Sequence, residues 1–213
     1  TTLDASINLA SGTNLNFLPS SSMSYGGQLS GSGTLNIQGS SGSRVIYSGA
    51  ASHTGGTNLN SGTFQIGDGT TVLNDFPGSI LVDSNSSLEF NLPNNQASGI
   101  ITSSITSTGS IKNISNQELR LDSVQSHAGT TDISGGSLGF KVDGGSILNL
   151  NGSISGNGAL KKHGSGELIL SGNNSFTGGL KLKNGRVTVG GSGAIPSSGR
   201  DINFGGGEFS PGV

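Results

Sequence analysis

The chain contains no cysteine and no tryptophan, and it is poor in charge and in aromatic rings. Without cysteine, neither disulfide bonds nor thiolate chemistry is possible. Lys and Arg number 10 against 12 Asp and Glu, and the longest basic run is Lys161-Lys162. This balance argues against a nucleic-acid-binding protein, and the sequence shows neither a basic footprint for phosphate nor a polybasic membrane patch. No apolar run approaches the roughly 18 residues that a membrane-spanning helix requires, so we expect no membrane insertion by this segment.

Glycine, serine, threonine and asparagine fill most of the chain, with 39 glycines among 213 residues and only 30% hydrophobic residues. A globular domain of this composition would bury little apolar surface. A solenoid avoids the difficulty, because each winding needs only a thin inward stripe of apolar side chains. Disorder is the competing interpretation of such a composition. The low charge and the regular spacing of the apolar residues argue against it.

One motif occurs three times, near residues 33–67, 109–140 and 158–190. Each copy consists of short segments with apolar residues at alternate positions, bounded by Gly, Asn or Ser, as expected of strands separated by turns. No segment shows helical periodicity. Repetition of this kind indicates one supersecondary unit that is stacked on itself.

Alignment of the three copies predicts which side chains face the interior. Residues two apart in a strand point the same way, so the aligned apolar pairs should line one face and the polar residues between them should face solvent. We also expect each strand to pair in parallel with its equivalent in the next winding, so that aligned residues form ladders along the axis. The residues predicted to point inward are Leu35, Val45, Tyr47, Leu59, Phe64, Ile66, Ile111, Leu119, Leu121, Ile133, Leu138, Phe140, Leu160, Leu168, Leu170, Leu182, Val187 and Val189.

Glycines recur before the first and last strands of every copy, where a chain that turns sharply needs a positive φ or a close backbone approach. They are Gly33, Gly62, Gly109, Gly136, Gly158 and Gly185. The equivalent positions His53, His127 and Phe176 lie 74 and 49 residues apart. Both offsets are near multiples of about 25 residues, a plausible length for one winding. We therefore expect about eight or nine windings in a rod about 40 Å long.

The third copy has the most specific pattern: residues 158–179 read G-x-L-x-K-x-G-x-G-x-L-x-L-x-G-x-N-x-F-T-G-G. This resembles the passenger-associated repeat of Gram-negative autotransporters, the type V secretion proteins. The copy at 33–67 matches it moderately, and the copy at 109–140 weakly. The resemblance implies an all-β fold, a right-handed parallel β-helix, carried to the cell surface by a C-terminal translocator barrel. We expect residues 1–213 to be a single solenoid domain and a piece of a longer passenger.

The resemblance implies a class of functions without choosing among them. Autotransporter passengers are mostly adhesins, and others are released toxins, proteases, esterases or host-signalling factors. The repeat belongs to the stalk and to secretion, and it transfers no catalytic residue. The leading interpretation is a cell-surface adhesin that attaches to host cells, matrix, glycans or sister bacteria. The alternatives are a released factor that acts on a host receptor and, third, an enzyme.

The residues themselves favour no enzyme. His53 and His127 align with Phe176, which marks a packing position, and they lie about three windings apart, too far to share a metal. Ser165 sits in a repeat turn rather than on the strand–turn–helix elbow of a serine hydrolase.

Enzymes that cleave polysaccharides on a parallel β-helix need clustered carboxylates. Here Asp122, Asp132 and Asp143 fall on different parts of a winding, and Glu118 and Glu167 lie about two windings apart. A solvated face accounts for these acids. We therefore predict no catalytic residue, no metal site and no cofactor.

Stretches that depart from the repeat are where solenoids usually carry binding. Three such stretches stand out: Gly39–Ser43, Asp75–Asp83 and Asn91–Ser104. The candidate contact residues are Asp75, Phe76, Asn94, Asn95, Gln96 and Arg44.

Overall fold

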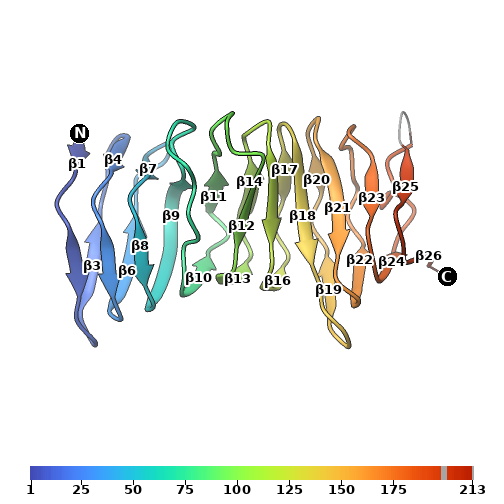
Figure 1. Ribbon diagram of the computed structural model, residues 1–213, viewed down its shortest axis with the longest axis horizontal. Helices are drawn as coiled ribbons and strands as arrows, with labels where there is room; N and C mark the ends of the chain where they lie inside the picture. Colours follow the sequence, from blue (N-terminus) through green and yellow to red (C-terminus); the bar gives the residue numbers. More distant parts are fainter. Residues whose placement is uncertain (198–200, 213) are drawn as a thin grey trace.

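The computed structural model describes residues 1–197 and 201–212, and they form one rod of parallel strands. The strands lie across the long axis and follow one another in sequence from the blue end to the red end, so the two termini lie at opposite ends (Figure 1). The described residues include no helix, and therefore none that could cross a membrane. The chain is an all-β parallel solenoid.

The chain visits three faces of the rod in a fixed order, and each face is a ladder of parallel strands. Face 1 contains β1 (Thr2–Leu3), β4 (Met23–Tyr25), β7 (Arg44–Tyr47), the second half of β9 (Gly56–Ile66), β11 (Ser86–Phe90), β14 (Ser110–Asn113), β17 (Thr131–Ile133) and β20 (Ile154–Ser155). Face 2 contains β2 (Ile7–Leu9), β5 (Leu29–Gly31), β8 (Ala51–His53), β12 (Ser98–Ile101), β15 (Glu118–Leu121), β18 (Ser137–Lys141), β21 (Ala159–His163), β23 (Leu180–Leu182) and β25 (Ile202–Phe204). Face 3 contains β3 (Asn14–Phe17), β6 (Thr34–Gln38), the first half of β9, β10 (Ser79–Val82), β13 (Ser104–Ser107), β16 (Val124–His127), β19 (Ile147–Leu150), β22 (Glu167–Leu170), β24 (Arg186–Val189) and β26 (Glu208–Pro211).

Strand β9 is long because it turns the corner from face 3 to face 1 and joins these two ladders into one 17-stranded sheet. Face 2 is divided into a 3-stranded and a 6-stranded sheet. Between these two sheets the chain forms the irregular segment 67–78, which takes the place of a face 2 strand.

The windings can be counted on face 3, where one full winding leads from each strand to the next. Face 3 has ten strands, so the rod has nine full windings between the first and the last of them. This agrees with the predicted number. The windings are shorter than expected. Paired residues in successive windings are 19 residues apart at the least, as for Leu170 and Val189, and 25 at the most, as for Ile80 and Ile105. The estimate of about 25 residues is therefore the upper end of the range.

The three motif copies begin on three different faces. Leu35 lies in β6 of face 3, Ile111 in β14 of face 1 and Leu160 in β21 of face 2. The prediction that aligned residues stack in one ladder is therefore wrong. The physical reason is the shorter winding: the offsets between copies amount to whole windings plus about one third. The unit that repeats is one strand with its corner, and all three faces accept it.

The predicted interior is confirmed. Every residue predicted to point inward is buried except Val189, which is half-buried in the last windings. These residues are buried although the motif copies lie on different faces, because alternation within a strand directs every second side chain into the rod on any face. The first four windings are filled by stacked rings. Tyr47 lies 5.4 Å from Tyr25 and 5.5 Å from Phe76 between ring centroids.

The glycine columns work as expected, by two different means. Gly62, Gly136 and Gly185 have φ values of +83°, +54° and +75°, a region that residues with a side chain rarely adopt. Gly109 instead makes a close approach, since a Cβ there would lie 2.2 Å from the carbonyl oxygen of Asp83. In either case a residue with a side chain would be strained or would clash with the neighbouring winding.

The basic pair Lys161-Lys162 is split by strand alternation, and Lys162 points into the rod, where it is fully buried. Its Nζ donates to carbonyl oxygens at the corners of three successive windings: His163 and Gly164 at 2.6 Å, Asn184 at 3.3 Å and Val142 at 3.4 Å. Burial lowers the pKa of Lys162 to about 8, against the opposing charge of Asp143, so the ammonium form prevails at neutral pH. The motif lysine is thus a donor that closes a corner.

The second copy has Asn113 at the position of Lys162. Asn113 is also fully buried, and its Nδ2 donates to the carbonyl oxygens of Gln117 at 3.0 Å and Ser137 at 2.9 Å. The same corner problem is therefore solved by an amide. In the first copy the position holds Ile37, which is buried without such a role.

Substitution of Lys162 by methionine should destabilise the rod. The side chain keeps its bulk but the corner carbonyl oxygens lose their donor, at a cost of about 1–3 kcal/mol. For a chain of this size, thermal unfolding should shift down by about 5 °C. The matched control is Lys181→Met, which removes an exposed lysine from the neighbouring strand and should change stability little. Equal shifts for the two variants would contradict the role given to Lys162.

Two histidines are buried in the rod. His127 is 1% exposed, and its Nε2 lies 2.9 Å from Oγ1 of Thr131. Burial lowers its pKa to about 4, although hydrogen bonds with the backbone of Ser107 and Thr130 oppose the shift. His127 is therefore neutral in the folded chain at neutral pH.

The buried His127 should make folding sensitive to mild acid. Between about pH 6.5 and pH 4 the unfolded chain binds a proton that the folded chain does not, so stability is complete above this window and falls through it, by up to about 3 kcal/mol. The variant His127→Gln should lose this share of the pH dependence. The measurement is the free energy of unfolding in urea at pH 7.0 and pH 4.5 for both proteins. An identical decrease for both would show that His127 is not responsible.

Candidate binding surfaces

The first predicted contact stretch, Gly39–Ser43, forms the corner between β6 of face 3 and β7 of face 1. Ser43 is buried, and its Oγ donates to the carbonyl oxygen of Ser40 at 2.7 Å, which closes the corner. Ser40, Ser41 and Gly42 are exposed. The corner therefore presents a small polar loop on a fixed base.

This loop borders a shallow groove of about 500 Å³ that runs across the same corner of the following windings. The groove is lined by Gly39, Ser41, Gly42, Ser61, Gly62, Thr63, Asn85, Ser86 and Ser87. The lining is entirely uncharged and offers hydroxyl groups, one carboxamide and backbone groups. Such a surface suits a partner that is recognised by hydrogen bonds rather than by charge.

The second stretch begins in the irregular segment 67–78, and its two candidate residues differ. Asp75 accepts hydrogen bonds from the backbone N–H of Thr102 at 2.8 Å and from the Thr102 hydroxyl. It thereby joins the segment to the next winding. Phe76 is 1% exposed and packs edge-on against Phe64 and Tyr47, at 5.5 Å from each. As a correction to the sequence-based choice, Phe76 is a core residue and is not available to a partner.

The third stretch contains an exposed turn with Asn94 and Asn95 at its tip. The turn is closed by the N–H of Gln96, which donates to the carbonyl oxygen of Pro93 at 3.0 Å. The side chain of Gln96 pairs with the backbone of Leu73, accepting at 2.7 Å and donating at 3.0 Å. The two asparagines are therefore open to a partner, and Gln96 holds the segment beside them.

Arg44 is committed to a buried carboxylate. Its Nη2 lies 2.9 Å from Oε2 of Glu89, and its Nη1 donates to Oε1 of Gln65 at 2.7 Å. The side chain of Glu89 is only 5% exposed, and Lys112 approaches its other oxygen at 3.4 Å. Two cations thus compensate one buried acid on face 1, which explains why Arg44 is only partly exposed.

His53 and His127 lie on different faces, because the motif copies that contain them begin on different faces. His53 ends β8 on face 2, and His127 ends β16 on face 3. Nε2 of His53 lies 2.7 Å from the carbonyl oxygen of Gly33, so this ring is tied to a corner. Over residues 1–197 and 201–212, no three His, Asp or Glu side chains come together as a group that could hold a metal ion.

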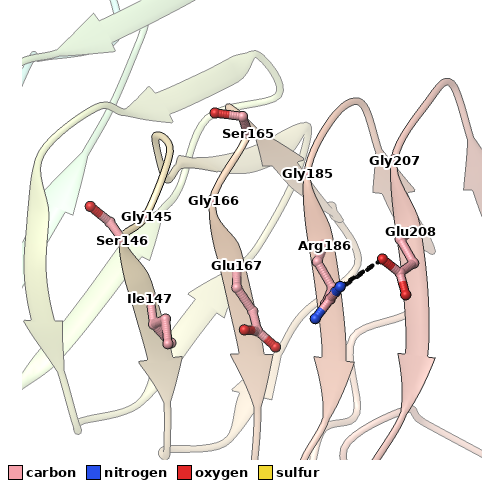
Figure 2. A pocket seen from close by; sticks show the side chains of 10 residues that line it. All are labelled: Gly145, Ser146, Ile147, Ser165, Gly166, Glu167, Gly185, Arg186, Gly207 and Glu208. Carbon is pink, nitrogen blue, oxygen red and sulfur yellow. Dashed lines mark hydrogen bonds and ion pairs between the residues drawn. The ribbon is translucent and has the colours of Figure 1, made fainter.

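A second groove, of about 510 Å³, lies at the start of the last four strands of face 3. Figure 2 shows Ile147, Glu167, Arg186 and Glu208 projecting from successive strands, below corners that hold Gly145, Gly166, Gly185 and Gly207. Arg186 and Glu208 form an ion pair at 2.9 Å. The sequence analysis missed this groove, because its residues line up only when the true winding lengths are known.

Comparison with known proteins finds similarity over part of the chain. A model of the passenger-associated-transport-repeat matches residues 29–66 and 160–189. The chain is 33% identical over 139 residues to a protein named adhesin BmaC autotransporter, from Brucella suis biovar 1 (strain 1330). The alignment covers 64% of this chain and 4% of that much longer protein. No solved structure matches the chain.

The two matched ranges overlap the first and third motif copies, which contain the corner glycines Gly62 and Gly185. The third also contains Lys162, the corner donor. The family pattern is thus a pattern of corners and inward stripes. Together with the parallel solenoid, these matches support an autotransporter passenger with passenger-associated transport repeats.

Proposed function

We propose that the chain is an adhesive part of a passenger on the surface of a Gram-negative bacterium, where it contacts host cells, matrix, glycans or sister bacteria. The full-length protein would carry a C-terminal translocator for export. Two findings support the proposal: the passenger-associated repeats, and a relative whose name includes the word adhesin.

The single observation that carries the proposal is the uncharged groove beside Gly39–Ser43. It lies on a corner whose backbone is bonded to the windings on both sides, as in the 3.1 Å bond from the N–H of Gly39 to the carbonyl oxygen of Ser61. A site that is already rigid loses little conformational entropy on binding. The exposed turn with Asn94 and Asn95 offers a second small surface of the same chemistry.

An adhesive role also fits how the reactive side chains are used. Both histidines of the repeat column are buried, and Glu118 and Asp122 are engaged with the cations Lys161 and Arg120. Side chains committed to packing and ion pairs are poorly placed for acid–base catalysis. The interpretation as an enzyme has no comparable support.

Introducing a charge into the groove should abolish most attachment. In Ser41→Glu an exposed serine of the groove becomes a carboxylate, which should weaken attachment of cells that display the chain by about tenfold, or about 1.4 kcal/mol. The matched control is Ser153→Glu, an exposed serine at the equivalent corner between β19 and β20 and outside both grooves. Attachment is counted on cultured cells, on matrix-coated surfaces and in bacterial aggregation, with thermal unfolding measured for both variants.

Three outcomes would contradict the proposal. Equal loss of attachment in both variants would remove the groove from the contact surface. No attachment by cells that display the native chain would remove adhesion itself. A response of host cells to the purified chain, without attachment, would favour a released factor instead.

A further inference from the structure

Positive charge gathers on face 2, although the chain as a whole is slightly acidic. Five of the nine described Lys and Arg residues point outward from this face. We call them, together with His163, the basic patch: Arg120, Lys141, Lys161, His163, Lys181 and Lys183. They come from four different windings, so the sequence contains no basic run that would indicate this cluster.

The patch consists of two rows that run along the rod axis. In the first row, Arg120 on β15 is followed by Gly139 on β18, Lys161 on β21 and Lys181 on β23. In the second row, Lys141 pairs with His163, and Lys183 follows in the next winding. Neighbouring members of a row are separated by the strand spacing of about 4.8 Å. The charges therefore form a narrow band rather than a ring or a pocket.

Three acids compensate only part of this band. Glu118 pairs with Lys161, and its Oε1 lies 3.5 Å from Nε2 of His163. Asp122 lies 2.5 Å from Arg120, and Asp143 lies 3.0 Å from Lys141.

Lys181 and Lys183 are the uncompensated end of the band. Both side chains are exposed, and neither side chain forms a hydrogen bond or an ion pair within residues 1–197 and 201–212, although the backbone N–H of Lys183 donates to the carbonyl oxygen of Lys162 at 2.9 Å. The nearest acid along the next strand is Asp201, which lies two positions before Asn203, the partner of Lys181. These two lysines are open to an external anion.

We propose that the basic patch binds a linear anionic polysaccharide that lies along the rod axis, with Lys181 and Lys183 as its principal contacts. The band is narrow and runs along the axis, and each of four successive windings contributes at least one cation, as contact with a linear polymer of acidic groups would require. This site is distinct from the groove at Gly39–Ser43, and it does not depend on the adhesive function.

Other polyanions fit the patch less well. The five Lys and Arg residues fall within the range of about 4–8 cations that binds an anionic membrane. The acids Glu118, Asp122 and Asp143 lie among them, so only a narrow band stays positive, which matches one polymer chain better than an extended lipid surface. Single-stranded nucleic acid needs a series of aromatic platforms for its bases, and beside the two open lysines the next strand of face 2 exposes a single ring, Phe204.

His163 provides a reporter inside the patch. Its pKa is lowered first by burial and also by Arg120, Lys161 and Lys183, while Glu118 opposes the shift. An anion bound at Lys181 and Lys183 would favour the protonated ring and so raise the pKa of His163. Nuclear magnetic resonance of the imidazole signals can follow this change with and without the polymer.

The test measures binding of the purified chain to dextran sulfate, with uncharged dextran as the control polymer. The native chain should bind only the sulfated polymer. Lys181→Gln and Lys183→Gln should each weaken binding about threefold, and the double variant about tenfold. Raising the salt from about 0.1 M to about 1 M should abolish binding, because the Debye length falls from about 10 Å to about 3 Å.

The matched control is Arg186→Gln, which removes one exposed positive charge from the adjoining face 3 and should leave binding unchanged. The proposal is overturned if the double variant binds like the native chain, or if Arg186→Gln weakens binding as much as either lysine variant. It is also overturned if phosphatidylserine vesicles or duplex DNA bind with the same dependence on both lysines. Thermal unfolding of each variant shows that a loss of binding is not a loss of folding.

Discussion

The parallel hydrogen-bond ladder between successive windings is the interaction on which the rest of the structure depends. Each strand has its backbone partners about 20 residues earlier and later in the chain, so no winding is complete without its neighbours. The ladder fixes the strand spacing, and strand alternation then decides which side chains fill the rod. A chain with few apolar residues can fold in this way because the interior is only one stripe wide on each face.

The corners are the second constraint, and three kinds of residue satisfy it. Glycine supplies a left-handed backbone or a close approach, as at Gly185 and Gly109. Buried donors such as Lys162 and Asn113 donate hydrogen bonds to corner carbonyl oxygens that do not take part in the strand ladder. A buried ammonium ion is tolerable here because several carbonyl oxygens surround it.

The sequence was sufficient for the fold class, the inward residues and the corner glycines, since these follow from local features: alternation within a strand and the backbone conformation that a sharp turn requires. It was not sufficient for the winding length, because offsets such as that between His53 and His127 contain a fraction of a winding that the residues alone do not reveal. This error placed aligned residues in one ladder when they lie on different faces. It also hid the basic patch, whose members come together only in the correct register. Phe76 looked like part of an insertion, yet the irregular segment 67–78 turns it inward to complete the aromatic stack.

The rotation of the motif copies has a consequence for how such a rod changes over time. In a solenoid whose repeat equals one winding, a duplicated repeat presents its outer side chains on the same face as the original. Here a duplicated motif copy would keep its inward residues and corner glycines, but its outer side chains would lie on the next face of the rod. Recombination between copies would therefore place new surface residues on different faces and leave the interior unchanged.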